Sequence, residues 1–356
     1  MPIVSATDLR NVTKRILQNE GATEANASRV AEGLVASNLA GHDSHGVQMV
    51  MGYANAIREG YIDPAAEPEI VQETSSTALV RGHWGFGHVA AKFALEAAVA
   101  KAKRESIAWV NLVEANHTGR VGEYVEMAVD GGIATIITVG GAGEDTPMAV
   151  PFGGREALLS TNPIAFGFPA GDEPPLIADF ATTTVAGGKV LLAKNKGEEL
   201  PLGCVVDRDG VPSTNPEDFY DGGALVQFGG HKGYAISLLV EFMGRILGAA
   251  DDFADTDRGG PMFRRGASSR HVGVSILAMD PRAFEGRASA AEKSARFLRK
   301  LRSAPTATAV SNVMSPGDQE RTSKFERAAV GIPIPDEVWD GIQALLAYPS
   351  ERPRVP

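Results

Sequence analysis

The chain has 356 residues, 44% apolar and 22% charged, which is the composition of a globular protein long enough for two or three domains. Its formal net charge of −10 argues against a nucleic-acid partner, although local positive charge in a cleft can still attract an anionic substrate. The single cysteine, Cys204, excludes an internal disulfide and is expected to be a small buried side chain. We recognise no signal peptide and no apolar run near the roughly 20 residues of a membrane span, so we expect a cytoplasmic protein without a membrane partner.

Residues 1–70 are predicted to form a helical subdomain. Ser5 and Thr23 have the chemistry of N-cap residues for two helices, of which the first ends at Gly21 and the second near residue 38. A third helix, with apolar side chains at helical spacing, ends at Gly60. Between the second and third helices, residues 41–46 read Gly-His-Asp-Ser-His-Gly, which predicts a tight loop that presents polar side chains.

A mixed sheet with packed helices is predicted to follow, so the expected fold class is α+β. Its strands and helices are expected at these positions: strands 69–73, 77–81, 107–113, 133–139, 164–168 and 176–180, and helices 89–103, 121–129, 182–195 and 231–247. Residues 83–88 are expected to form a glycine-punctuated turn, residues 140–154 an irregular loop and residues 204–210 a small hairpin. Later elements are a strand at 271–279 and helices at 288–302 and 336–347. We expect residues 71–250 to form the catalytic and cofactor-binding α/β domain, and residues 251–356 to pack back on both other parts.

The glycine-rich loops do not predict a Rossmann fold. Residues 141–146 fail the dinucleotide fingerprint at its last position and precede a proline-containing loop, where the fingerprint requires a helix. Residues 82–87 also miss the spacing. The chain has no Gly-x-Ser-x-Gly elbow and no phosphate-binding Gly-Lys-Ser/Thr loop, which removes the commonest hydrolase and nucleotide-triphosphatase functions.

Two histidines are candidates for proton transfer. His45 lies in the first polar loop, and His117 lies in a second one, Asn-His-Thr-Gly-Arg at residues 116–120, directly after a predicted strand. Imidazole titrates near working pH, and we expect the two loops to meet across one substrate. Two alternatives remain: loop histidines that bond to backbone, or His42 and His45 as metal ligands. No His-Glu-x-x-His pattern supports the metal, and we expect none.

Two charged residues are candidates for binding. Asp179 ends a buried strand before a hydroxyl-rich segment, where it is able to orient a histidine, bind a ribose or simply complement a helix dipole. Lys232 begins an apolar helix after two glycines. A cation there opposes the helix dipole, so either a bound anion explains it or it is a solvated surface lysine.

Several short motifs occur in an order that resembles one known family. They are Asp-Ser-His-Gly at 43–46, Asn-His-x-Gly at 116–119, Ser-Thr-Asn-Pro-Ile-Ala-Phe at 160–166, Asp-x-Ala-Thr at 179–182, Gly-Lys at 188–189, Gly-x-Lys-Gly-Tyr at 230–234 and Pro-Gly-Asp at 316–318. Together they resemble the type 2 malate/L-lactate dehydrogenase family, which includes sulfolactate and ureidoglycolate dehydrogenases and diketogulonate reductase. The similarity covers essentially the whole chain, and the ordered set is specific although each motif alone is weak.

The resemblance implies NAD- or NADP-dependent interconversion of 2-hydroxy and 2-oxo acids on a homodimer with a non-Rossmann fold. By position, His45 matches the family's proton donor, Ser44 its neighbour on the substrate, and His117 a rival for proton transfer. Asp179 would orient the histidine that transfers the proton. The cofactor-binding positions implied in the same way are Asp179, Phe180, Ala181, Thr182, Thr183, Thr184, Val185, His231, Lys232, Gly317, Asp318 and Gln319.

The substrate side departs from the family pattern at two positions. Many relatives have an arginine four residues after the Asp-Ser-His-Gly histidine and another before the loop's first glycine, whereas this chain has Met49 and Ala40. This context is similar to the hydroxycarboxylate dehydrogenase branch, which accepts phenylpyruvate-like acids. We expect Arg120 to replace the missing carboxylate clamp, because a planar guanidinium grips a carboxylate with two bonds. The expected substrate-binding residues are therefore Arg120, Met49 and Gly141.

The function predicted from the sequence is thus hydride transfer between nicotinamide and a 2-oxo acid carbon, with His45 or His117 supplying the proton. Three alternatives stay open: a metal-dependent hydrolase using His42 and His45, a reductase of cyclic imine 2-carboxylates on the same scaffold, and a non-catalytic binding protein. The sequence leaves open the choice of NAD or NADP, the substrate and the stereochemistry of the alcohol.

Overall fold

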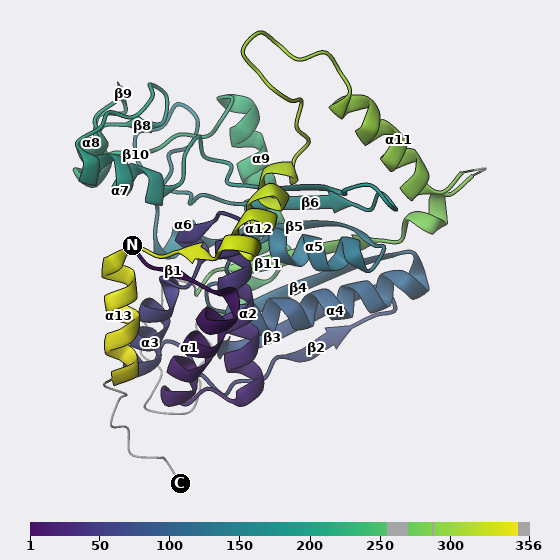
Figure 1. Cartoon of the computed structure of the whole chain (residues 1–356), viewed down its shortest axis with the longest axis horizontal. Helices are drawn as coiled ribbons and strands as arrows, with labels where there is room; N and C mark the ends of the chain where they lie inside the picture. The colour runs from purple at the N-terminus through teal and green to yellow at the C-terminus, as the bar shows by residue number, and fades with distance from the viewer. Residues whose placement is uncertain (255–269, 287, 348–356) are drawn as a thin grey trace.

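A central sheet with helices packed on it organises the computed structural model, which describes residues 1–254, 270–286 and 288–347 (Figure 1). A group of N-terminal helices lies beside one end of the sheet, and a small lobe lies above the other strands. Within the described residues, no helix is both long and apolar enough to cross a membrane.

Seven strands form the central sheet in the order β2-β3-β4-β11-β5-β6-β7. Their bounds are β2 (Glu69–Glu73), β3 (Thr77–Gly85), β4 (Ile107–Ala115), β11 (Gly273–Met279), β5 (Ala134–Gly140), β6 (Ile164–Phe168) and β7 (Leu176–Phe180). The β3–β4 pair is parallel, and every other neighbouring pair of this sheet is antiparallel. The sheet is therefore mixed, which confirms the predicted fold class.

One edge of this sheet collects loops from distant parts of the sequence. Strands β4 and β5 are each antiparallel to β11, so they run in the same direction, and β7 runs that way as well. Their carboxyl ends therefore lie at the same edge of the sheet. The loops that leave this edge begin at Asn116, Gly141 and Ala181, and each contains residues that were predicted to bind substrate or cofactor.

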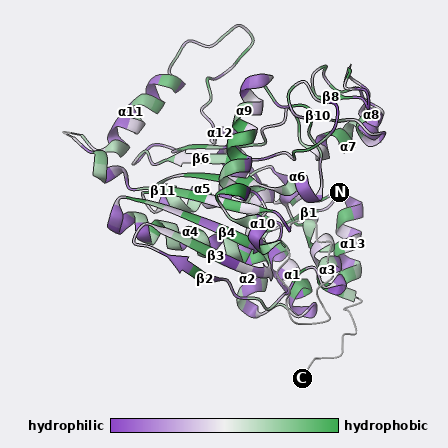
Figure 2. Cartoon of the chain, turned by 180° about the vertical axis from the view of Figure 1, so that it is seen from behind, coloured by the Kyte–Doolittle hydropathy of each residue, from purple (hydrophilic) through white to green (hydrophobic). Residues whose placement is uncertain are grey.

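Two helices, α4 (Gly87–Glu105) and α5 (Gly122–Asp130), cover one face of the sheet. The inner face of α4 is built from small side chains, including Ala90, Ala94 and Ala98, which let the helix lie close to Leu112 and Ile276. Figure 2 shows hydrophobic residues dominating the helix α9 (His231–Glu241), whereas the edge strand β2 is largely hydrophilic. Exposed charge on an edge strand discourages pairing with another sheet.

The N-terminal helices form a second core together with the C-terminal helix. This group contains β1 (Ile3–Val4), α1 (Ala6–Asn19), α2 (Glu24–Leu39), η1 (Asp43–His45), α3 (Met49–Glu59), β12 (Ile332–Pro333) and α13 (Asp336–Ala347). Ser5 and Thr23 cap α1 and α2 as predicted, and Gly60 ends α3 with φ of +83°. Because Ile332 and Ile342 are buried among the N-terminal apolar residues, both ends of the chain build this core.

The small lobe lies between β7 and α9 in the chain. It contains α7 (Gly187–Lys196), β8 (Val205–Val206), β9 (Pro212–Ser213), α8 (Pro216–Tyr220) and β10 (Ala224–Leu225). The predicted hairpin is confirmed, because β8 pairs antiparallel with β9. Cys204 is buried beside Val190 and Leu225, as expected of a small apolar side chain. After α9 the chain continues as a π-helical turn, η2 (Phe242–Ile246), and then α10 (Ala250–Phe253).

The structure differs from the prediction at four places. The expected turn at 83–88 is divided between β3 and α4, although His83 and Trp84 do adopt left-handed backbone conformations. The expected helix at 182–195 begins only at Gly187, because the backbone at 182–184 bonds to Thr161 and Val226 instead. The loop at 140–154 contains a short helix, α6 (Ala142–Asp145).

The fourth difference is a helix that the sequence did not predict, α12 (Asp318–Val330). Only Asp318 is buried on this helix, so its sequence has no apolar periodicity to reveal it. The expected strand at 271–279 and the helix at 288–302 are present as β11 and α11 (Ala290–Arg302), joined through η3 (Pro281–Phe284). The helix α11 projects from the body of the molecule (Figure 1).

Candidate active site

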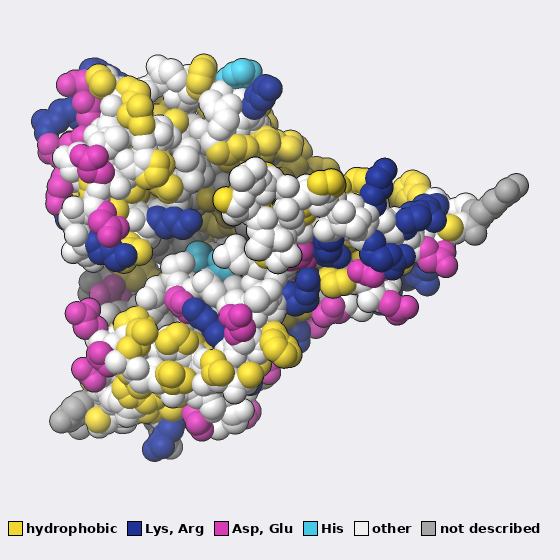
Figure 3. All heavy atoms as spheres, turned by 45° about the horizontal axis from the view of Figure 1, so that its top comes forward, with side chains coloured by type: hydrophobic (Ala, Val, Ile, Leu, Met, Phe, Trp, Pro, Cys, Tyr) yellow, Lys and Arg dark blue, Asp and Glu magenta, His cyan; other side chains and the backbone are white. Residues whose placement is uncertain are grey.

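The two polar loops predicted from the sequence meet in the structure. The rings of His45 and His117 lie with their centroids 5.5 Å apart and their planes tilted by 31°. His45 comes from η1 in the N-terminal helical group. His117 comes from the loop that follows β4, at the edge of the sheet where the carboxyl ends of β4, β5 and β7 lie. Figure 3 shows histidine side chains in the hollow between the two lobes of the molecule.

The first loop is held in place by Asn38 and Arg327. Asn38 accepts a hydrogen bond from the backbone N–H of Val47 (2.8 Å) and donates one to Asp43 (2.6 Å). The guanidinium of Arg327, on α12, binds both carboxylate oxygens of Asp43 at 2.6 and 3.0 Å. A Cβ on Gly46 would overlap the Asn38 side chain. Asp43 and Gly46 therefore shape the loop, which leaves Ser44 exposed and the ring of His45 facing that of His117.

The second loop is anchored by Asn116. Its side-chain amide donates hydrogen bonds to the carbonyl oxygens of Trp84 (2.7 Å) and Tyr61 (3.1 Å). The Nδ1 atom of His117 lies 2.7 Å from the hydroxyl of Tyr53, which is buried on α3. Burial, together with the nearby charge of His45, lowers the pKa of His117 to about 4. His117 is therefore a neutral imidazole at neutral pH.

His45 has a more polar environment. Its Nδ1 atom lies 3.1 Å from the hydroxyl of Ser44, and its side chain is half-buried. Burial lowers its pKa, partly offset by the negative charge of Asp179. His42 is directed elsewhere, with its Nε2 atom 3.2 Å from a carboxylate oxygen of Glu320 on α12. Within the described ranges, no group of three or more His, Cys, Asp or Glu side chains is arranged to hold a metal ion.

Arg120 and Asp179 form the next part of the site. The Asp179 carboxylate accepts a hydrogen bond from the backbone N–H of Gly122 (2.7 Å). Burial raises the pKa of Asp179, and this hydrogen bond and the charge of Arg120 offset only part of that rise. A Cβ on Gly122 would lie 2.6 Å from Nη1 of Arg120 and 2.9 Å from Oδ2 of Asp179. The Arg120 side chain also donates to Glu126 (2.8 Å), and its buried Nε has no partner in the described part of the chain. Asp179 therefore lies beside Arg120, and its charge reaches His45 through space.

The predicted cofactor segment at 179–185 follows β7. The hydroxyls of Thr182 and Thr183 donate to backbone carbonyls, of Thr161 (3.0 Å) and Val185 (2.8 Å) respectively. Thr184 and Phe180 are exposed, and Ala181 and Val185 are half-buried. The hydroxyls of Thr182 and Thr183 therefore fix the backbone of this segment, and its other side chains are exposed or half-buried.

The start of α9 lies next to this segment, because the N–H of Phe228 donates to the carbonyl of Thr182 (3.0 Å). Gly229 and Gly230 have positive φ angles, and no side chain caps the helix. His231 and Lys232 are exposed on its first turn. Free backbone N–H groups beside a cation suit a phosphate group. The residues present therefore fit a nucleotide cofactor.

The Pro-Gly-Asp motif also lies beside β7, since the carbonyl of Pro316 accepts a hydrogen bond from the N–H of Ile177 (3.2 Å). The carboxylate of Asp318 is buried and bonds to Arg302 at 2.9 Å, so it stabilises the junction of α11 and α12. Gln319 is exposed and Gly317 is half-buried with φ of +94°. Residues 316–319 are thus close to β7, but the carboxylate of Asp318 is already paired with Arg302.

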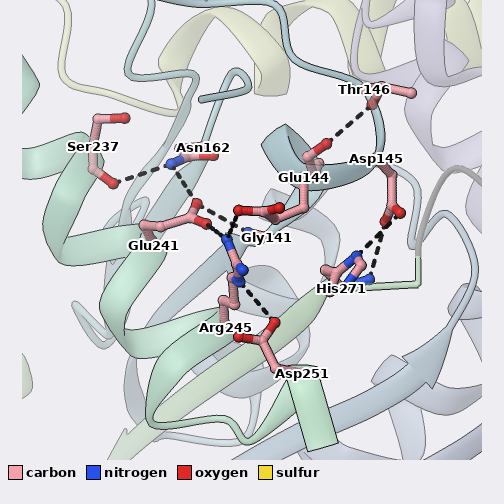
Figure 4. Close-up of polar contacts among 11 residues, drawn as sticks. Gly141, Glu144, Asp145, Thr146, Asn162, Ser237, Glu241, Arg245, Asp251 and His271 are labelled. Atoms are coloured by element: carbon pink, nitrogen blue, oxygen red, sulfur yellow. Dashed lines mark hydrogen bonds and ion pairs between the residues drawn. The ribbon is translucent and has the colours of Figure 1, made fainter. Parts of the chain in front are cut away.

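The other two predicted substrate residues are placed differently. Met49 begins α3 and is half-buried against the N-terminal core. The N–H of Gly141 donates to Glu241 (3.0 Å), and a Cβ there would overlap the carbonyl oxygen of His271. Figure 4 shows Gly141 in a network with Asn162, Glu241 and Arg245. The backbone N–H of Gly141 is therefore already used within the protein.

Sequence analysis missed the residues that support the histidines. Tyr53 lies on a helix whose apolar periodicity indicated only a core, and His88 was expected in the turn at 83–88. Asn38 ends a predicted helix without a recognised motif, and Arg327 lies on a helix that was not predicted. The available signal was Tyr53 itself, since a tyrosine on the buried face of a helix needs a partner for its hydroxyl.

Residues 4–343 match the family described as malate/L-lactate dehydrogenase. The chain belongs to the malate/L-lactate dehydrogenase family. It is 32% identical over 340 residues to hydroxycarboxylate dehydrogenase B of Escherichia coli (strain K12), covering 95% of this chain and 91% of that protein.

Two further relatives are named for other activities. A Delta(1)-pyrroline-2-carboxylate/Delta(1)-piperideine-2-carboxylate reductase of Pseudomonas putida is 31% identical over 343 residues, covering 96% of each protein. The solved structure of sulfolactate dehydrogenase from Methanocaldococcus jannaschii superposes with a TM-score of 0.86 at 30% identity, covering 97% of both chains. This member of the malate/L-lactate dehydrogenase family is a 2-hydroxy acid dehydrogenase, and its family implies a nicotinamide cofactor.

Proposed function

We propose that this dehydrogenase interconverts 2-hydroxy and 2-oxo acids between His45, His117 and Arg120, with NAD or NADP as the cofactor. The observation that carries the proposal is the 5.5 Å separation of the two imidazoles, which lets both contact one small molecule. When bound, the nicotinamide takes or supplies the hydride. The remaining work, which is binding the acid and moving its proton, belongs to the residues of this chain.

We assign the proton transfer to His117. Its Nδ1 atom is occupied by Tyr53, so Nε2 is the nitrogen that remains for a substrate oxygen. A neutral imidazole with a lowered pKa is ready to accept the hydroxyl proton during oxidation. His45 and Ser44, from the facing loop, would bind the same oxygen or the neighbouring carboxylate.

Arg120 would bind the substrate carboxylate. Its guanidinium is buried and pre-oriented by Glu126 and Asp179, and its Nε has no protein partner in the described structure. A fixed planar guanidinium pays little entropy when it binds a carboxylate with two hydrogen bonds. Met49 replaces a charged residue of many relatives, which favours an acid with a larger apolar side chain.

The cofactor would lie across the 179–185 segment and the start of α9. The uncapped N-terminus of α9 and Lys232 would bind its phosphates, and the exposed part of the 179–185 segment would contact the rest. Asp179 is near the carboxyl end of β7, and the 316–319 segment lies beside Ile177 near the amino end of the same strand. We expect a Lys232→Ala variant to raise KM for the cofactor while leaving KM for the acid unchanged.

A cyclic imine 2-carboxylate is the second candidate substrate. It shares the carboxylate beside an sp² carbon with a 2-oxo acid, and a relative at 31% identity is named as a reductase of such imines. The same arginine clamp and proton donor would serve both substrates. A panel of 2-oxo acids, including phenylpyruvate, and of cyclic imines, each with NADH and NADPH, decides between them.

We also propose a homodimer. Leu239, Phe242, Ile246 and Leu247 follow one another along α9 and η2, and each is exposed although strongly apolar. A contiguous apolar stripe of this kind is typical of a protein–protein contact. Analytical ultracentrifugation should give twice the chain mass, and Phe242→Glu should shift the protein toward monomer.

The central test is substitution of the two histidines. His117→Asn and His45→Asn should each lower kcat by at least about 10²-fold, because each removes a group that contacts the reacting oxygen. His83→Gln is a matched control, since its side chain pairs with Glu69 on β2. Unchanged turnover in both site variants would refute the assignment. Activity that is lost on chelation of metals would favour the hydrolase alternative.

A further inference from the structure

Tyr53 lies between two imidazoles in the interior of the protein. Its hydroxyl oxygen is 2.7 Å from Nδ1 of His117 and 3.3 Å from Nε2 of His88. A phenol has one proton, so it donates to one ring nitrogen and accepts from the other. Burial lowers the pKa of both histidines, so both rings are neutral. It follows that the two rings carry their protons on matching nitrogens, either both on Nδ1 or both on Nε2.

The position of the His88 ring is fixed by two glycines. A Cβ on Gly119 would overlap Cε1 of His88 and lie 2.7 Å from its Nε2, and a Cβ on Gly33 would overlap its Nδ1. Gly119 also has φ of +77°, which other residues rarely adopt. The ring therefore fills a slot between α2 and the loop that carries His117, with Nε2 toward Tyr53 and Nδ1 toward α2.

The charged groups around His88 Nδ1 decide between the two arrangements. Nδ1 of His88 and Oε2 of Glu123 are both buried, and neither has a hydrogen-bond partner among the residues described. They face a common point, because a Cβ on Gly33 would overlap the first and lie 2.9 Å from the second. Arg29 is the other charge here, and it donates to Oε1 of Glu123 (2.7 Å) and to the backbone oxygen of His88 (3.2 Å).

A proton on His88 Nδ1 best satisfies these groups. An N–H group at Nδ1 would point toward Oε2 of Glu123, which otherwise has no hydrogen-bond partner among the described residues. A lone pair at Nδ1 would instead repel that oxygen and leave it without a hydrogen bond. With the proton on Nδ1, His88 Nε2 accepts the Tyr53 proton. The Tyr53 oxygen then accepts from His117 Nδ1–H.

We propose that Tyr53 and His88 are positioning residues that hold His117 with its proton on Nδ1, leaving Nε2 free to exchange a proton with the substrate oxygen. The inference rests on the proposed function, because it assigns His117 its task in that reaction. During oxidation of a hydroxy acid, the O–H bond breaks and its proton goes to Nε2, while the adjacent C–H bond gives its hydride to the cofactor. The imidazolium that results keeps its Nδ1–H bond to Tyr53, and reduction reverses each step.

The first test reads the tautomer directly. In solution a neutral imidazole prefers the Nε2–H form, so an Nδ1–H ring is the mark of an imposed arrangement. Long-range ¹H–¹⁵N spectra of the full chain, labelled at its seven histidines, distinguish the two forms, and His117→Asn assigns the signal of interest. We expect Nδ1–H at His117 in the wild-type protein. An Nε2–H pattern overturns the inference.

The second test removes the bridge. Tyr53→Phe should return His117 to the Nε2–H form and lower kcat at least about tenfold with little change in KM. Tyr124→Phe is the matched control, because it removes an equally buried hydroxyl that donates to the carbonyl of Thr118, and His117 should keep its wild-type tautomer. A His117 tautomer that is unchanged in Tyr53→Phe refutes the role of Tyr53. If the wild-type ring is Nδ1–H but no 2-hydroxy acid is oxidised, the proposed function fails and the tautomer assignment stands.

Discussion

Gly119→Ala offers a sharp test of how the second loop is built. The substitution has two costs that can be separated. The first is the left-handed backbone at φ of +77°, which costs a residue with a Cβ about 1–2 kcal/mol. The second is the new methyl group, which would overlap Cε1 of His88 and lie 2.7 Å from Nε2. Overpacking of this kind costs a further 1–3 kcal/mol or so, giving a total loss of about 2–5 kcal/mol of unfolding free energy.

A matched control isolates the contact with His88. Gly132 has φ of +78°, and no atom lies within 4 Å of the Cβ that would be added there. Gly132→Ala should therefore lose only the backbone cost of about 1–2 kcal/mol and keep wild-type kcat. The difference between the two variants measures the clash with His88 by itself.

Displacement of His88 should also reach the chemistry. Its ring contacts Tyr53, which in turn contacts His117, so a shift of about 1 Å along this chain would lower kcat by roughly 10²-fold. Urea denaturation gives the two unfolding free energies, and steady-state assays of the folded variants give kcat. If Gly119→Ala is no less stable than Gly132→Ala and has wild-type kcat, the packing argument is wrong.

Three other predictions concern the charges of the site. Arg120→Lys should raise KM for the acid at least about tenfold, because a lysine cannot bind the carboxylate with two bonds, and steady-state kinetics measure it. Arg327→Met should cost only about 1 kcal/mol in urea denaturation but lower kcat/KM, because it frees the loop that carries His45. Unfolded imidazoles bind protons near pH 6.5 and folded His117 only near pH 4, so stability should fall as the pH drops from about 6.5 to 4.

Each of these has its own control. An unchanged KM in Arg120→Lys would mean that another group binds the carboxylate. Arg299→Met removes an exposed ion pair between Arg299 on α11 and Glu173, and it should leave kcat/KM unchanged. An equal loss in both arginine variants would show that Arg327 has no special role. For the pH dependence, His117→Asn should flatten the fall in the urea midpoint, and an identical slope would assign the effect to other groups.

Local chemistry explains why much of the fold was predictable. Caps such as Ser5 and Thr23, the terminating Gly60, and the apolar strands at 164–168 and 176–180 act over a few residues, so the sequence alone determines them. The order of short polar motifs was also sufficient to place the chain in its family and to single out His45 and His117. Where the prediction was wrong, as at 182–186, backbone bonds to distant segments replaced the local helix.

The tertiary structure decided how the histidines are supported. Arg327 reaches Asp43 across 284 positions of sequence, and its helix α12 has almost no buried face from which to predict it. Tyr53 belongs to a helix whose periodicity indicates only a core, and His88 to a segment expected to be a turn, yet the Tyr53 hydroxyl lies between the rings of His117 and His88. Hydrogen bonds and burial depend on which elements the sheet brings to one edge. Residue types and spacing therefore determined which groups were available for chemistry, whereas long-range packing decided their partners, their charge states and the direction in which each proton points.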